Sequence, residues 1–158
     1  MFGMGFVKQI KLAMQSAIPP NGVTAPPKVV ERGTFTGSTK GLTPAEKNAI
    51  EKLLSQGRNV EIIPRSNVQG VSSPDFLVNG VPTELKTISG SSPNTPVTRI
   101  TDGFAQNAER VILDARNTWM TIEDANATIS RVKGIFNNNI PGSIEIWTSE
   151  GTVIFGGQ

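Results

Sequence analysis

The chain contains neither cysteine nor histidine among its 158 residues. Without cysteine it can form no disulfide bond and no thiolate metal site, so its redox compartment cannot be read from the sequence. Without histidine it cannot use Ser-His-Asp or Cys-His catalysis, build a histidine zinc site or cleave RNA with paired histidines. Any metal ion must therefore rest on oxygen ligands, which favours Mg²⁺ or Mn²⁺.

Long apolar runs are also missing, although apolar residues make up an ordinary 37% of the chain. No run is long enough to cross a bilayer, and residues 1–7 are too short and too weakly apolar for a signal peptide. We therefore expect no stable membrane insertion by this polypeptide. Its length suits one domain with a hydrophobic core and an appendage.

The net charge is small, at +2, but it is unevenly distributed. Residues 1–40 hold five Lys or Arg against one acidic residue, whereas residues 41–158 hold ten against twelve. The basic character belongs to the N-terminal arm. A nucleic acid would have to be held by local basic clusters, because the whole domain provides no strong positive field.

The N-terminal arm, residues 1–41, reads as a helix followed by a linker. Residues 1–17 can form a short amphipathic helix with Phe6 and Ile10 on one side. Residues 18–41 are rich in Pro, Gly, Thr and Ser, which is typical of a linker or extended arm. We place a domain boundary near Gly41 and assign residues 42–158 to one domain.

A β-hairpin is the clearest local signal of that domain. Two short apolar strands flank an Asn-Gly turn at residues 79–80. Side chains at i and i+2 of a strand share a face, so Glu84 and Lys86 point together and Leu85 points away. Pairing about the turn brings Asp75 across from them. Two carboxylates and one ammonium then converge, and such a group can hold a divalent cation beside a positive charge.

The remaining pattern alternates helices and strands. Thr43, Pro44 and Glu46 form a helix start, with an N-cap, a proline at the first position and a capping-box glutamate, and Gly57 ends that helix. Further along we expect a strand at 59–63, the hairpin, a helix at 97–109, a strand at 110–114, a helix from 121 to 137–139, and strands at 143–148 and 152–155. The order αβββαβαββ predicts an α/β (α+β) fold with a mixed sheet flanked by helices.

The hairpin also carries a resemblance. The Pro-Asp at residues 74–75 followed by Glu-Leu-Lys at residues 84–86 resembles the signature of the PD-(D/E)xK nuclease superfamily, whose αβββαβ core is similar in order. Segments 70–80, 84–87 and 108–114 resemble the C-terminal RNase toxin domains of contact-dependent growth inhibition (CdiA-type) effectors of bacteria. The similarity covers roughly residues 43–155.

The resemblance implies a catalytic set of Glu46, Asp75, Glu84 and Lys86. Asp75 and Glu84 would bind one or two divalent cations, Mg²⁺ or Mn²⁺, with the backbone carbonyl of Leu85 as a further ligand. Lys86 would orient the attacking water or stabilise charge in the transition state. The simpler alternatives are a turn aspartate at 75, a solvated charge pair on the strand, and a glutamate at 46 that only caps its helix.

Four further residues are candidates for substrate binding: Thr87, Arg99, Gln106 and Arg110. The resemblance favours a polar side chain at Gln106 near the active centre, and Arg99 and Arg110 bracket its helix and can bind phosphate. Each has a structural alternative. Thr87 can have a packing or backbone role, Gln106 can be a solvated helix residue, and Arg110 can pair with a neighbouring acid.

The function implied is that of a metal-dependent endonuclease toxin, with tRNA the favoured substrate. The resemblance further implies secretion within a larger cell-surface effector, action in the cytoplasm of a competing target cell, and neutralisation by a cognate immunity protein. One alternative is a DNase of the same fold, because the motif does not read the 2′-OH. Another is a non-catalytic nucleic-acid-binding or phage structural module in which the motif has decayed.

Overall fold

The computed structural model describes residues 29–65, 67–90 and 92–157, so the helix expected over residues 1–17 lies outside the described part of the chain. The elements are β1 (Phe35–Thr36), α1 (Pro44–Ser55), β2 (Val60–Ile62), β3 (Phe76–Val78), β4 (Val81–Thr87), α2 (Thr95–Ala105), β5 (Arg110–Asp114), α3 (Ile122–Ile135), β6 (Ser143–Trp147) and β7 (Thr152–Phe155). The expected α/β fold is confirmed, and its order gains a strand at the start.

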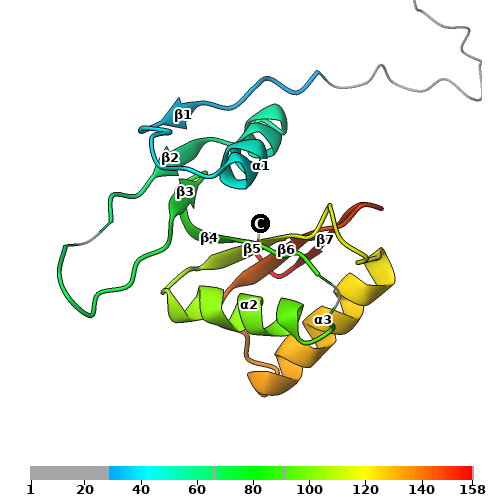
Figure 1. Ribbon diagram of the computed structural model, residues 1–158. Coiled ribbons are helices and arrows are strands. Elements are labelled where there is room, and N and C mark those ends of the chain that lie inside the picture. The colour runs from blue at the N-terminus through cyan, green and yellow to red at the C-terminus, as the bar shows by residue number, and fades with distance from the viewer. Residues whose placement is uncertain (1–28, 66, 91, 158) are drawn as a thin grey trace, which may run out of the picture.

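The strands form one seven-stranded mixed sheet and lie side by side in chain order. Strands β2, β3 and β4 pair antiparallel, as do β6 and β7, while β1 with β2 and β4 through β6 pair parallel. Parallel neighbours need crossover connections, which α2 and α3 supply on one side of the sheet. Figure 1 shows α1 over the other side.

Each face of the sheet buries its own hydrophobic core, because alternate strand residues point to opposite faces. In β5, Ile112 packs with the α1 side, whereas Val111 and Leu113 pack with α2 and α3. Helix α2 lies very close to β5 at Gly103, where an added Cβ would come within 2.7 Å of the side chain of Val111. Trp147 is fully buried on the α1 side.

The helix starts follow from their first residues. The hydroxyl of Thr43 accepts a hydrogen bond from the N–H of Glu46 at 3.1 Å, and Thr121 forms a full capping box with Asp124.

Among the described residues, no helix combines the length and apolar character that a bilayer-spanning segment needs.

Strand β1 lies in the segment that the sequence pattern predicts as linker. The segment is tied to the domain by several contacts. The N–H of Gly33 donates to the carbonyl of Leu54 at 2.8 Å, and a guanidinium nitrogen of Arg32 lies 2.8 Å from Oε1 of Glu51. A two-residue strand is too short to show an alternation of apolar and polar residues. Its pairing with β2 therefore cannot be predicted from the sequence pattern and is seen in the structure.

Candidate active site

The β3–β4 hairpin places the two carboxylates of the motif opposite each other. Asn79 and Gly80 both adopt positive φ, at 50° and 81°, as the tight two-residue turn requires. The register pairs Phe76 with Thr83, so Asp75 continues opposite Glu84. Burial, followed by the charge of Glu84 and a hydrogen bond with it, raises the pKa of Asp75 to about 6.

Lys86 supplies the positive charge that the sequence places beside these acids. Its Nζ atom lies 2.8 Å from Oε2 of Glu84, and both side chains are largely enclosed. The other oxygen, Oε1 of Glu84, is buried and has no hydrogen-bond partner among the described residues. A buried carboxylate oxygen without a partner is costly. A proton shared with Asp75, or a bound cation, would satisfy it.

Strand β4 runs on beyond the end of β3, and in the part of the chain that the structure describes, no strand pairs with that edge of its last residues. The carbonyl of Pro82 accepts from the N–H of Glu109 at 2.9 Å, and the N–H of Ile88 donates to Asp114 at 3.2 Å, both on the β5 side. Backbone groups of successive strand residues point to opposite edges. The carbonyl of Leu85 therefore faces the edge that β3 does not cover, next to the two carboxylates.

A cavity of about 510 Å³ surrounds this edge, and we call it the carboxylate cavity. It brings together most of the residues that the sequence analysis singles out. Its lining is Thr43, Ala45, Glu46, Arg65, Ser73, Asp75, Glu84, Leu85, Lys86, Thr87, Arg99 and Gln106. Asp75 directly precedes β3, and Glu84 and Lys86 belong to β4, while residues at the start of α1 and along α2 provide the two walls.

The candidate residues outside the hairpin motif differ in how far their side chains are buried. Glu46 is half-buried at the start of α1, and Gln106 is half-buried at the end of α2. Thr87 and Arg99 are exposed at the rim. Glu46 and Gln106 therefore both line the cavity that contains the two carboxylates, and their roles stay predictions.

Arg110 does not lie with the other candidates. It pairs in register with Thr83, one residue before Glu84, and so points to the opposite face of the sheet. There it is buried, and its Nη1 donates to the carbonyl of Val78 at 3.3 Å. Burial and then the charge of Arg58 lower its pKa. Arg110 lines neither the carboxylate cavity nor the cavity beside it, so we assign it no substrate contact there.

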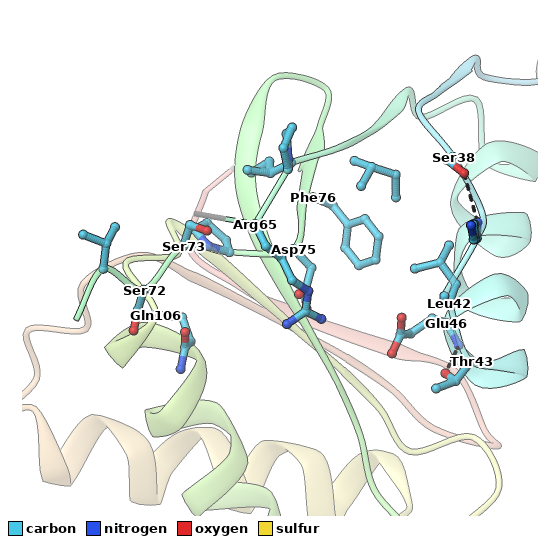
Figure 2. A pocket seen from close by; sticks show the side chains of 17 residues that line it. Ser38, Leu42, Thr43, Glu46, Arg65, Ser72, Ser73, Asp75, Phe76 and Gln106 are labelled. Carbon is cyan, nitrogen blue, oxygen red and sulfur yellow. Dashed lines mark hydrogen bonds between the residues drawn. The ribbon is translucent and has the colours of Figure 1, made fainter. Parts of the chain in front are cut away.

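A second cavity of about 590 Å³ adjoins the first, and we call it the loop cavity. Figure 2 shows it between α1, which carries Glu46, and the end of α2, which carries Gln106, with Arg65 and Asp75 between them. Arg65 is not among the site residues that the sequence predicts. Its only local signal is a cation placed just after a strand, in the polar loop that leads to Asp75.

The oxygen donors at the β4 edge suit a hard cation. Within the described ranges, no group of three or more His, Cys, Asp or Glu side chains is arranged to hold a metal ion. The donor set is two facing carboxylates, Asp75 and Glu84, and the carbonyl of Leu85. Mg²⁺ keeps several waters and is often bound through one or two protein carboxylates and the substrate phosphate. This set, with its unpartnered Glu84 oxygen, fits such an ion.

Comparison with known proteins places the chain in a family. Residues 72–153 match the family model described as the contact-dependent growth inhibition CdiA C-terminal domain. The fold is similar to that of a chain in the CdiA-CT/CdiI toxin and immunity complex from Burkholderia pseudomallei, with a TM-score of 0.56 and 15% sequence identity over 79% of this chain and 100% of the other. No curated protein matches the chain. The chain belongs to the family of CdiA C-terminal domains of contact-dependent growth inhibition.

Proposed function

We propose that this domain is a metal-dependent endonuclease toxin of the PD-(D/E)xK type, with tRNA as its favoured substrate. The observation that carries the proposal is the convergence of Asp75, Glu84 and Lys86 at the uncovered edge of β4. Two facing carboxylates beside a lysine, in a cavity that opens between two helices, form a site for phosphodiester hydrolysis.

The divalent cation, Mg²⁺ or Mn²⁺, would be held by the carboxylates of Asp75 and Glu84 and by the carbonyl of Leu85. Such an ion, when bound, lowers the pKa of a coordinated water and neutralises charge on the scissile phosphate. The raised pKa of Asp75, caused first by burial and then by the charge of Glu84, is consistent with this assignment, because a cation between the two acids would offset their mutual repulsion.

The other side chains have distinct tasks. Lys86 places a fixed ammonium beside the acids, where it can stabilise the charge that develops on the phosphate in a partly buried site. Glu46 faces the same cavity from α1 and can accept a proton or orient water. Arg99 and Gln106, on α2, can hold the phosphates on either side of the scissile bond, and Thr87 can add a hydroxyl at the rim.

Membership of the CdiA C-terminal family supports a toxin role. The similar Burkholderia domain was solved as a toxin and immunity complex, and we infer that a cognate immunity protein neutralises this domain as well. The domain would be secreted within a larger cell-surface effector and would act in the cytoplasm of the target cell. Its nucleic-acid partner would be bound by the local cations of the cavities, because the net charge is low.

The test is cleavage by the purified full chain of total bacterial tRNA and of plasmid DNA, each with Mg²⁺, with Mn²⁺ and with EDTA. We expect metal-dependent cleavage of tRNA that is lost in Asp75→Ala, Glu84→Ala and Lys86→Ala. Glu61→Ala is a matched control, since Glu61 is an exposed strand glutamate that lines neither cavity. Circular dichroism and melting curves of every variant report on the fold.

The outcomes separate the alternatives. Cleavage of plasmid DNA alone would make the domain a DNase of the same fold. Binding of nucleic acid without cleavage under any metal condition would indicate a non-catalytic module. Near wild-type cleavage by all three folded variants would place the active site elsewhere.

A further inference from the structure

We propose that the loop cavity receives the nucleotide next to the scissile phosphate, with Arg65 on its phosphate, so that the domain cleaves unpaired strands. This inference rests on the proposed nuclease function and extends it to the substrate class. It is carried by the position of the loop cavity, by the side chains that line it and by its size.

The loop cavity is continuous with the proposed catalytic centre. The two cavities share six lining residues: Thr43, Glu46, Arg65, Ser73, Asp75 and Gln106. A strand whose phosphate lies at Asp75 and Glu84 would therefore pass directly into the loop cavity with its neighbouring nucleotide. The opposite wall comes from the segment that joins β1 to α1, which contributes Ser38 and Lys40.

The lining offers each part of a nucleotide a matching surface. Leu42, Ile62 and Pro64 provide apolar area against which a base can lie. Hydroxyl groups from the β1–α1 segment and from the loop before Asp75 can form hydrogen bonds with base edges, and so can the amide of Gln106. The cations Lys40 and Arg65 also line the cavity and can contact the sugar-phosphate backbone.

Arg65 lies where the two cavities meet. It is exposed, and it projects toward Asp75 in Figure 2. Its positive charge lowers the pKa of Asp75, against the larger effects that raise it. A guanidinium at this junction can bind a phosphate with two parallel hydrogen bonds. Arg65 would thus be a substrate-binding residue that fixes the strand on one side of the scissile bond.

The size of the loop cavity decides the form of the substrate. A volume of about 590 Å³ lies in the range that encloses a single small ligand. It has room for one nucleotide splayed out of its stack, and we infer that a base still paired to a second strand is excluded. Proteins that read unpaired bases hold them in this way, by stacking and by bonds to their edges.

The first experiment compares RNA forms. An end-labelled RNA hairpin, its single-stranded loop sequence and a matching duplex are incubated with the full chain and Mg²⁺, and the cleavage positions are mapped. We expect cleavage in the hairpin loop and in the single strand, with the stem and the duplex at least tenfold slower. Equal rates in stem and loop would overturn the inference and leave the nuclease assignment intact.

The second experiment tests Arg65 by binding, so it does not depend on cleavage. The dissociation constants of labelled single-stranded RNA and of a matching duplex are measured against salt for the Glu84→Gln chain with and without Arg65→Ala. Loss of one phosphate contact should weaken binding about tenfold and reduce the slope of log Kd against log salt by about 0.7. Arg65→Lys should restore part of the affinity but not the bidentate geometry.

Lys47→Ala is the control for these measurements, because Lys47 is an exposed cation on α1 that lines neither cavity. An unchanged salt slope in Arg65→Ala, or equal affinity for single strand and duplex, would contradict the inference. Absence of cleavage of every RNA and DNA, together with single-strand preference in binding, would instead remove the nuclease function and keep the strand-binding cavity.

Discussion

The Nζ atom of Lys86 lies 2.8 Å from Oε2 of Glu84, two residues earlier on the same strand, and the two side chains are only 18% and 7% exposed. This pair lies on β4. Among the described strands, β3 pairs with the start of β4, and β5 pairs with it from Thr83 to Thr87. Lys86 therefore has a structural task, neutralising a buried acid, in addition to the catalytic task proposed for it.

We expect Lys86→Ala to destabilise the fold by about 1–3 kcal/mol, because removing one partner leaves Glu84 buried and uncompensated. Urea unfolding measures the change. The double variant Lys86→Ala/Glu84→Gln should recover part of it. The exposed pair of Arg32 and Glu51, at 56% and 62% exposure, is the comparison, and Arg32→Ala should cost less than about 1 kcal/mol. Equal losses in the two pairs would argue against a buried charge at Glu84.

Activity should require a cation that prefers oxygen ligands. We expect Mg²⁺ and Mn²⁺ to support cleavage and Zn²⁺ to be a poor substitute, because the chain has no histidine or cysteine to hold it. Cleavage rates after EDTA treatment and metal readdition give the measurement. Robust cleavage in excess EDTA would contradict the metal-dependent mechanism and indicate a metal-free RNase.

The raised pKa of Asp75 predicts how stability changes with pH in metal-free protein. The folded state holds this proton up to about pH 6, against an ordinary value of 3.8, so the contribution of Asp75 to stability falls as pH rises through that window. Asp75→Asn keeps the neutral form. After allowance for partial exposure, it should be about 1 kcal/mol more stable than wild type at pH 7.5 and equal to it near pH 4.

The measurement is thermal or urea unfolding of both proteins in EDTA across that pH range. Asp102→Asn is the control, because Asp102 is exposed on α2 and lines neither cavity. A gain of the same size at Asp102, or a gain at Asp75 that does not change with pH, would refute the explanation.

Shortening the N-terminal arm should separate catalysis from binding. A chain that starts at Val29 keeps β1 and the Arg32–Glu51 contact, and we expect wild-type stability and turnover. A chain that starts at Gly41 loses β1, Ser38 and Lys40, so its melting temperature should fall and its KM should rise while kcat stays close to wild type. Steady-state kinetics at several salt concentrations test this. Loss of kcat in a folded chain would mean that the arm completes the active site.

The parts of the fold that the sequence predicts are those fixed by local rules. The Asn-Gly turn at 79–80 sets the hairpin register, and that register alone brings Asp75 opposite Glu84. The helix start at Thr43 follows from its hydroxyl and the proline after it. These signals need no knowledge of distant segments, and the fold class follows from the order of such elements.

The parts that the sequence does not predict depend on long-range pairing. Arg110 begins a strand whose register with β4 decides which face it reaches, and a shift of one residue would have brought it to Glu84 and Lys86. Arg65 belongs to a long loop, and its approach to Asp75 depends on where that loop folds back. Strand β1 is too short to show alternation and forms only against β2.

Strand β3 has three residues and its partner β4 has seven, and this inequality divides the site into a rigid and an adaptable half. Glu84 and Lys86 stand on β4, which pairs with β5 from Thr83 to Thr87, and Asp75 directly precedes β3, whereas Ser38, Lys40 and Arg65 stand on connecting segments. Amide hydrogens of β4 should therefore exchange slowly and those of residues 67–73 quickly. Substitutions in the connecting segments can change which nucleic acids are accepted while the reacting groups keep their positions, so substrate choice can evolve without rebuilding the chemistry.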